Sequence, residues 1–194
     1  MTGVVLAGGK SVRFGSNKAL ELLMGKRLIE HALAALRPFC TGLMVVANDL
    51  EPYLDLDLDA ALVRDVVPDQ GPLGGIYSAL LFSPHDWIFA RATDMPFLVP
   101  ALAEKMIESK NGFDAVVPRL GPHFEPLTAL YHWNCCPAVA RVLEQEGERK
   151  AAHFYRKINV RYVSEEEWRA VDPEGRSFRN ANTRQELAKL DGLE

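Results

Sequence analysis

Near its start the chain reads Leu6-Ala7-Gly8-Gly9-Lys10-Ser11-Val12-Arg13-Phe14-Gly15-Ser16-Asn17-Lys18, between a short β-rich run and the first helical pattern. Gly8 and Gly9 have no Cβ, so the backbone there can approach a ligand closely and expose its amide groups. Arg13 and Lys18 add two cations that can pair with phosphate oxygens. The stretch therefore predicts a phosphate-binding loop that joins a strand to a helix.

The spacing of these glycines differs from that of two well-known phosphate loops. The pattern Gly-x-Gly-x-x-Gly is absent from the stretch. The segment from Gly9 to Gly15 is one residue too long for a P-loop and lacks the Gly-Lys-Ser/Thr ending. An ordinary glycine-rich turn with solvated cations would show the same residues. The loop alone leaves both interpretations open, and other parts of the chain have to decide.

Short β-rich runs alternate with helical patterns over most of the chain. The runs comprise residues 4–6, 43–47, 62–67, 87–92, 115–117 and 127–131. Apolar residues recur at helical spacing from Leu28 to Leu36 and again from Leu102 to Ile107. The run 43–47 is wholly apolar, as strands of a parallel sheet buried on both faces are. We expect a three-layer α/β fold with a mostly parallel central sheet and helices on both faces.

Length and composition indicate one domain, residues 1–194, because one hydrophobic core can reach this size and no linker or repeat interrupts the chain. The 22 Lys and Arg residues against 26 Asp and Glu give a formal net charge of −4. This charge creates no general attraction for nucleic acid or an anionic membrane. No apolar run approaches membrane-spanning length. We therefore expect neither a nucleic-acid partner nor a membrane.

The cysteines and the N-terminus bear on the compartment. Cys40, Cys135 and Cys136 are odd in number and two of them are adjacent, so disulfide pairing is not expected. The N-terminus begins with a short apolar strand and shows neither the basic flank nor the long apolar region of a targeting signal. Both observations predict a reduced, cytoplasmic protein.

A second glycine-rich stretch reads Asp69-Gln70-Gly71-Pro72-Leu73-Gly74-Gly75-Ile76 and precedes a helical pattern. The Gly71-Pro72 pair predicts a rigid turn, and Gly74-Gly75 would let the N-terminus of the helix approach a ligand. Asp65 lies just before this stretch, at the end of a β-rich run. A plain helix-starting turn and a solvated carboxylate would explain the same residues, so both interpretations stay open.

The third motif, Thr93-Asp94-Met95-Pro96, directly follows the β-rich run 87–92. Open α/β sheets place their ligands beyond such strand ends. Proteins typically hold Mg²⁺ through one or two carboxylates, with phosphate oxygens and water completing the shell. Asp94 is therefore the best candidate for a metal ligand, although an Asx turn before Pro96 would use the same carboxylate.

Near the C-terminus the chain reads Phe178-Arg179-Asn180-Ala181-Asn182-Thr183. Thr183 and Glu186 have the spacing of a capping box for a helix, which explains part of the stretch without any function. Asn180 and Asn182 are left as candidates for contact with a substrate.

Together these motifs resemble those of Rossmann-like nucleotidyltransferases, and most of all those of the molybdenum cofactor guanylyltransferase family. The resemblance covers nearly the whole chain in order. It rests on Leu-Ala-Gly-Gly with Arg13, Phe14, Gly15 and Lys18, on the Gly-Pro-Leu-x-Gly turn with Asp65 before it, on Asp94, and on the pair Asn180 and Asn182. Members that transfer cytidylyl or uridylyl groups usually have Leu-Ala-Ala-Gly at the first motif, so Gly9 favours guanine.

The resemblance implies a Rossmann-like domain that transfers GMP from GTP to the phosphate of molybdopterin, with or without molybdenum, and releases pyrophosphate. It implies Mg²⁺ as the cofactor, catalytic roles for Arg13, Lys18 and Asp94, and Asp94 as the metal ligand. The implied nucleotide-binding residues are Leu6, Ala7, Gly8, Gly9, Lys18, Asn48, Asp65, Gly71, Pro72, Leu73 and Asp94. Asn180 and Asn182 would contact the acceptor. The N-terminal part would thus bind the nucleotide and the C-terminal part the acceptor, and molybdenum-insertion and cofactor-delivery proteins are the implied partners.

Two positions depart from the family pattern. The family commonly has an Asn after the second strand, and the corresponding Asn48 stands at a shifted position. Arg184 replaces the usual Pro after Asn-Thr. These departures affect the expected nucleotide contact and the local helix cap.

Two other functions fit parts of the pattern. A related cytidylyltransferase or sugar-phosphate nucleotidyltransferase would share the loop and Asp94 and differ in its base and acceptor pockets. A non-catalytic GTP sensor would share only the nucleotide site. Because a sensor needs no metal beside an acceptor site, the combination of the cations, Asp94 and the asparagine pair favours catalysis.

Overall fold

The computed structural model describes residues 1–8, 17–144, 151–181 and 184–191. Its central sheet has eight strands in the order β10-β7-β9-β6-β1-β4-β5, with β8 beside β7. The strands are β1 (Thr2–Leu6), β4 (Gly42–Ala47), β5 (Ala61–Arg64), β6 (Trp87–Ala92), β7 (Ala115–Leu120), β8 (His123–Phe124), β9 (Thr128–His132) and β10 (Val160–Val163). A separate hairpin consists of β2 (Leu22–Leu23) and β3 (Lys26–Arg27).

Most of the sheet is parallel. Strand β1 pairs in parallel with β4 on one side and β6 on the other, β4 pairs in parallel with β5, and β7 in parallel with β10. Strand β9 runs antiparallel to both β6 and β7. The expected mostly parallel α/β sheet is therefore confirmed.

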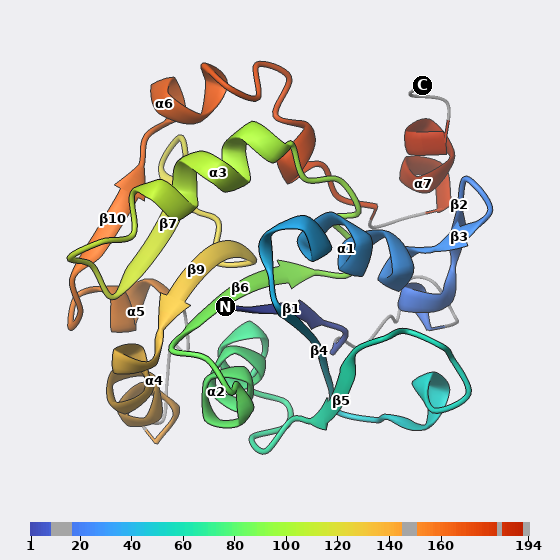
Figure 1. Ribbon diagram of the computed structural model, residues 1–194, viewed down its shortest axis with the longest axis horizontal. Helices are drawn as coiled ribbons and strands as arrows, with labels where there is room; N and C mark the ends of the chain where they lie inside the picture. Colours follow the sequence, from blue (N-terminus) through green and yellow to red (C-terminus); the bar gives the residue numbers. More distant parts are fainter. Residues whose placement is uncertain (9–16, 145–150, 182–183, 192–194) are drawn as a thin grey trace.

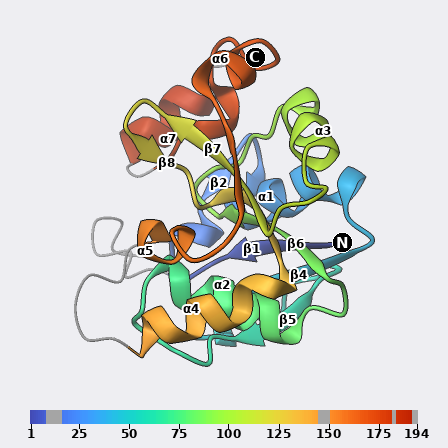
Figure 2. The ribbon, with the colours of Figure 1, turned by 90° about the vertical axis from the view of Figure 1, so that its left-hand side faces the viewer.

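Helices cover both faces of the sheet (Figures 1 and 2). One face carries α1 (Leu28–Leu36), α3 (Pro100–Glu108) and α6 (Glu165–Arg169), and the other carries α2 (Pro72–Phe82), α4 (Cys136–Leu143) and α5 (Ala151–Tyr155). Short 3-10 turns connect these elements: η1 (Lys18–Leu20), η2 (Arg37–Phe39), η3 (Glu51–Tyr53), η4 (Trp133–Cys135) and η5 (Arg176–Phe178). The expected three layers are present.

Alternation along the central strands divides the core into two halves. In β1, Val4 points toward the α2 face while its neighbour Val5 points toward the α1 face, and both are fully buried. Successive side chains of a strand point to opposite faces, so an apolar strand can serve both helix layers. Burying each such side chain contributes about 1.5–3 kcal/mol, which is why most side chains of the central strands are apolar.

The C-terminal helix α7 (Arg184–Asp191) lies against the β2–β3 hairpin near the start of α1. Leu187 and Leu190 of α7 form a small third core with Leu23, Leu28 and Ala181. This packing carries the C-terminal end of the chain back to elements that follow the first strand.

Strand β5 ends earlier than the expected run 62–67 suggests. The amide of Val66 donates to Ser78 Oγ at 3.0 Å, and the amide of Val67 donates to Asp65 Oδ1 at 3.0 Å. The Asp65 amide still donates to the carbonyl of Ala47, but the Val67 amide, which would continue the ladder to β4, bonds to the Asp65 side chain instead, so β5 stops at Arg64. The early end places Asp65 at the edge of the sheet. Among the described residues, no helix is long and apolar enough to cross a membrane.

Helix α2 approaches this edge closely because of Gly74. A Cβ on Gly74 would lie 2.6 Å from the carbonyl oxygen of Val67 and 3.1 Å from Asp65 Oδ2. Gly74→Ala is therefore expected to lower the free energy of unfolding by about 1–3 kcal/mol, as overpacking does. Chemical denaturation measures this change.

Gly42→Ala is a matched control. Its new Cβ would come no closer than 3.8 Å to His85, an ordinary contact. We expect this variant to change the free energy of unfolding by no more than about 0.5 kcal/mol. Equal destabilisation by the two variants would contradict the close approach of α2.

Candidate functional site

A cleft of about 350 Å³ opens at the carboxyl ends of β1, β4 and β5, against the N-terminus of α2. It is lined by Leu6, Gly8, Val46, Ala47, Asn48, Asp65, Asp69, Gly71, Pro72 and Gly75. The chain runs from β1 outward to β4 and β5 and then returns to β6 on the other side of β1. Ligands of open α/β sheets bind where the strand order reverses in this way. The cleft is therefore the candidate site.

The structure brings six of the expected nucleotide contacts to this cleft: Leu6, Gly8, Asn48, Asp65, Gly71 and Pro72. Leu73 differs, because its side chain is 1% exposed and packs in the core under α2. Only its backbone could face a ligand. Gly9 and Arg13 lie outside the described residues.

The carboxylate of Asp65 is held in place at the cleft wall. Its Oδ1 accepts hydrogen bonds from Ser78 Oγ at 2.7 Å and from the amide of Val67 at 3.0 Å. The whole residue is only 9% exposed. Asp65 therefore offers a preoriented acceptor, as recognition of a base or ribose donor requires.

The N-terminus of α2 forms another wall. Gly71 caps this helix with φ 61° and ψ −153°, a backbone region that is essentially restricted to glycine. Pro72 occupies the first turn, where its missing N–H is no loss. A Cβ on Gly75 would lie 3.0 Å from Leu6 Cδ2, so the helix start lies directly against the end of β1. Free amides at such a helix start favour an anion.

Tyr53 joins the two described ends of the glycine loop. Its hydroxyl donates to the carbonyl of Ala7 at 3.3 Å and accepts from Asn17 Nδ2 at 3.1 Å. Asn17 in turn accepts from the amide of Ala19 at 3.1 Å and so caps η1. Tyr53 is 1% exposed, and burial raises the pKa of its hydroxyl, which therefore stays neutral at physiological pH. No local sequence motif marks this residue.

Tyr53→Phe removes only the hydroxyl that bridges Ala7 and Asn17. The variant is expected to lose about 1 kcal/mol of unfolding free energy, the usual net value of a hydrogen bond. Binding of GTP, the nucleotide that the sequence predicts for this cleft, is expected to weaken by up to about tenfold, or 1.4 kcal/mol, because the loop ends are less firmly held. Calorimetric titration with GTP measures the affinity.

Tyr162→Phe removes a hydroxyl elsewhere, on β10, where the ring stacks on Phe124. It should leave GTP affinity unchanged. If Tyr53→Phe binds GTP as tightly as the natural protein, the bridge does not organise the loop.

Lys18 and Asp94 meet beside the cleft. Lys18 Nζ lies 2.8 Å from Asp94 Oδ2, and the two side chains are 15% and 26% exposed. Lys18 begins η1 after the glycine loop, whereas Asp94 follows the end of β6. The loop after β6 is tied to β1 because Thr93 Oγ1 donates to the carbonyl of Leu6 at 2.8 Å. Two of the three expected catalytic residues thus lie together.

The donor set suits a hard cation such as Mg²⁺. No group of three or more His, Cys, Asp or Glu residues that could hold a metal occurs within the described parts of the chain. A metal here would therefore rely on Asp94 together with phosphate oxygens and water. Mg²⁺ accepts this arrangement, whereas a structural zinc site does not.

The C-terminal segment lies next to the Asp94 loop. The amide of Ala181 donates to the carbonyl of Asp94 at 2.9 Å, and Ala181 is fully buried. Its neighbour Asn180 is exposed beside this contact. Asn182 and Thr183 lie outside the described residues, so the expected asparagine pair and capping box are seen only in part.

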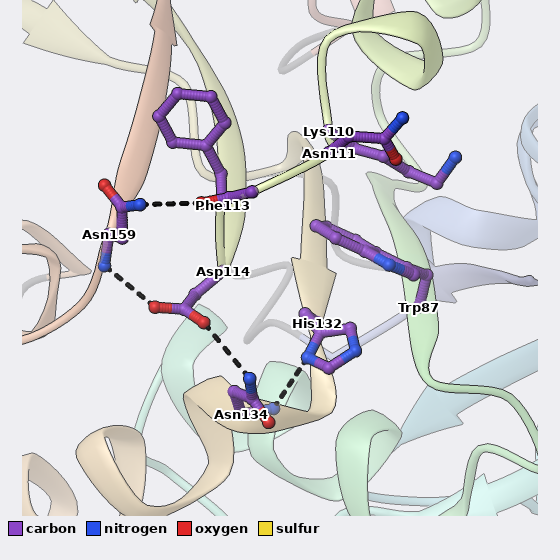
Figure 3. A pocket seen from close by; sticks show the side chains of 9 residues that line it. Trp87, Lys110, Asn111, Phe113, Asp114, His132, Asn134 and Asn159 are labelled. Carbon is purple, nitrogen blue, oxygen red and sulfur yellow. Dashed lines mark hydrogen bonds between the residues drawn. The ribbon is translucent and has the colours of Figure 1, made fainter.

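A larger cavity, of about 410 Å³, lies at the opposite ends of the strands, where β6, β7 and β10 begin and β9 ends (Figure 3). Asp114 points there toward two asparagines. Its Oδ2 accepts a hydrogen bond from the main-chain N–H of Asn159 at 2.9 Å, and its Oδ1 accepts one from Asn134 Nδ2 at 3.3 Å. The rings of Trp87 and His132 pack edge to face, and their centroids lie 5.0 Å apart. These contacts join the ends of β6, β7, β9 and β10. The cavity is thus remote from Asp94, and size alone does not identify the site.

The reversal of strand order and the Lys–Asp pair at the strand ends, together with the glycine-rich sequence after β1, are typical of nucleotide-binding α/β proteins. Residues 3–162 match the family model described as "MobA-like NTP transferase domain". The chain belongs to this family. The resemblance found in the sequence is confirmed, and as a member of this family the protein is a nucleotidyltransferase enzyme.

Individual relatives agree. The chain is 37% identical over 193 residues to a molybdenum cofactor guanylyltransferase of Desulfosudis oleivorans, covering 98% of this chain and 94% of the relative. A solved structure, molybdopterin-guanine dinucleotide biosynthesis protein A from Archaeoglobus fulgidus, superposes with a TM-score of 0.83 at 31% identity, covering 98% of this chain and 97% of that one. A cytidylyltransferase from Thermus thermophilus, 2-C-methyl-D-erythritol 4-phosphate cytidylyltransferase, shares the fold at 16% identity and a TM-score of 0.69, covering 98% and 96%.

Proposed function

We propose that this chain transfers GMP from GTP to the terminal phosphate of molybdopterin, with or without bound molybdenum, and releases pyrophosphate. The observation that carries the proposal is the Lys18–Asp94 pair at the switch point of the sheet, 2.8 Å apart. The relatives from Desulfosudis oleivorans and Archaeoglobus fulgidus support the choice of guanylyl as the transferred group and of molybdopterin as the acceptor.

In the proposed reaction an oxygen of the acceptor phosphate attacks the α-phosphorus of GTP. The new P–O bond forms as the bond to the β-phosphate oxygen breaks, and pyrophosphate takes the bonding electrons. A phosphate monoester has a second pKa of about 6, so it is already an anionic nucleophile near neutral pH and no general base is needed. The barrier is the approach of two anions, which makes charge neutralisation and alignment the catalytic tasks.

The residues of the cleft suit these tasks. Asp94 would hold Mg²⁺, which would supply positive charge to offset that of the phosphates. Lys18, together with Arg13, would neutralise charge on the triphosphate and the departing pyrophosphate. The backbone of residues 6–8 and the N-terminus of α2 would hold the nucleotide, with Asp65 as an acceptor at the wall.

The two parts of the chain would divide the substrates between them within one domain, residues 1–194. The N-terminal part, with its cleft, would bind GTP, and the C-terminal part would bind the acceptor through Asn180 and Asn182. The hydrogen bond from the Ala181 amide to the main-chain carbonyl of Asp94 supports this division, because it brings the C-terminal segment to the residue whose carboxylate would hold the metal. Molybdenum-insertion and cofactor-delivery proteins would be the partners upstream and downstream.

A reducing cytoplasm suits the cysteines. All three are free thiols, and burial raises the pKa of Cys135 to about 12 and that of Cys40 to about 11. A thiol with so high a pKa is a poor nucleophile near neutral pH. These cysteines therefore take no part in the proposed chemistry.

The direct test is incubation of the protein with GTP, Mg²⁺ and molybdopterin, followed by mass measurement of the product. A guanine dinucleotide of the pterin and an equal amount of pyrophosphate are expected. Parallel reactions with CTP, and with a sugar phosphate as acceptor, test the related transferases. A cytidine or sugar product would replace the proposal, and steady GTP binding without pyrophosphate release would indicate a sensor.

Asp94→Ala and Lys18→Ala test the catalytic pair. Each is expected to lower the rate of pyrophosphate release by about 100-fold to 1000-fold, because a contact made in the transition state is lost. Circular dichroism and thermal unfolding check that both variants fold.

Arg37→Ala is the matched control, since it breaks an exposed ion pair with Asp59 away from the cleft. Exposed pairs contribute only about 0–1 kcal/mol, so this variant should react at the natural rate. Near-normal turnover by folded Asp94→Ala would remove Asp94 from the mechanism.

A further inference from the structure

A charged side chain lies in the interior of the sheet next to the site. Arg91 in β6 is 0% exposed and is among the largest fully buried side chains. Burial lowers the pKa of its guanidinium to about 10, opposed by the carboxylates of Glu125, Asp94 and Asp172, so the group is still cationic at neutral pH. Burying a cation is costly unless hydrogen bonds compensate. Arg91 therefore requires an explanation beyond packing.

The guanidinium of Arg91 joins three segments. Its Nη1 donates to Thr128 Oγ1 of β9 at 2.7 Å and to the carbonyl of Ser177 at 3.1 Å. Its Nη2 donates to the carbonyls of Met95 at 2.6 Å and Phe97 at 2.5 Å. Met95 and Phe97 belong to the loop that carries Asp94, and Ser177 belongs to the segment that carries Asn180.

Other contacts join the same two segments. The amide of Val99 donates to Ser177 Oγ at 2.9 Å, and that of Ala181 donates to the carbonyl of Asp94 at 2.9 Å. The C-terminal segment is itself held by Asp172, whose carboxylate accepts from the amides of Arg176 at 2.8 Å and Ser177 at 2.9 Å. Residues 94–99 and 172–181 thus form one unit, with Arg91 beneath it.

We propose that Arg91 is a positioning residue, which clamps the loop carrying Asp94 to the segment carrying Asn180 and so fixes the metal-binding carboxylate relative to the acceptor. The proposal rests on the function proposed above and deepens it. Arg91 contacts neither substrate; it acts through the carbonyls of Met95, Phe97 and Ser177.

A purely stabilising role explains the contacts less well. An apolar side chain would fill the same space in the sheet without burying a charge, and replacing a buried ionic group by apolar residues is often neutral or stabilising. The planar guanidinium instead directs separate N–H groups to two segments at once. The shorter lysine ammonium keeps the charge but lacks this fork. Arg91→Lys therefore separates charge from geometry.

Kinetics of Arg91→Lys test the clamp. The KM for molybdopterin and the Mg²⁺ concentration for half-maximal rate are both expected to rise by about tenfold or more, since small misplacements of reacting groups are costly. The dissociation constant for GTP without metal should stay within about twofold, because the hydrogen bonds of the Arg91 guanidinium in the described structure go to Thr128, Ser177, Met95 and Phe97, none of which lines the cleft. A protein that is only destabilised would not show a raised KM and Mg²⁺ requirement together with an unchanged GTP affinity.

Arg161→Lys is the matched control, since the described hydrogen bonds of the Arg161 guanidinium go to Glu167 of α6 and the carbonyl of Tyr162, and to neither segment. It should change none of the three quantities. Arg91→Lys with natural KM and natural Mg²⁺ dependence, or with GTP affinity weakened in the same proportion, would overturn the proposal.

Hydrogen exchange gives a readout that does not depend on activity. In Arg91→Lys the amides of residues 94–99 and 172–181 are expected to exchange about tenfold faster together, while those of α2 keep their protection. Unchanged exchange in either segment would refute the clamp. If the natural protein makes no guanine dinucleotide, the proposed function fails, whereas the exchange experiment still decides whether Arg91 joins the two segments.

Discussion

The site depends on one constraint: β1 pairs in parallel with β4 and with β6 at the same time. Parallel strands end at the same edge of the sheet, so the residues after Leu6, Ala47 and Ala92 all emerge together. The reversal of strand order at β1 then separates the connections on its two sides and leaves a crevice between them. The described groups of the site follow the ends of β1, β4, β5 and β6 or contact residues that do.

The close packing of α2 and the local charges complete the site at these strand ends. Glycines let α2 come against the end of β1, where a side chain on Gly75 would meet Leu6. The chain has a net negative charge, yet Lys18 is held 2.8 Å from Asp94 at the sheet edge. In the proposed reaction an anionic substrate would therefore depend on local cations and on helix amides instead of on the overall field of the protein.

The amino-acid sequence predicts several of these strands and one of these side chains. The β-rich run 87–92 coincides with β6, and the run 43–47 lies within β4, because apolar β-branched and aromatic residues mark buried strands. The position of Asp94 after such a strand predicts it as a site residue. No pattern in the sequence singles out Tyr53 or Arg91. A tyrosine after a Pro and an arginine inside an apolar run carry no local motif, and both act on residues distant in sequence.

The sequence by itself determined the order of strands and helices, the glycine-rich turns and the residue types able to meet phosphate and metal, because these follow from local periodicity and backbone freedom. The tertiary structure decided which of them meet. Lys18 and Asp94 are 76 residues apart, and Arg91 binds a carbonyl 86 residues away. Such contacts depend on strand order and on the return of the C-terminal segment, and no local pattern encodes the distance between two side chains that only the folded sheet brings together.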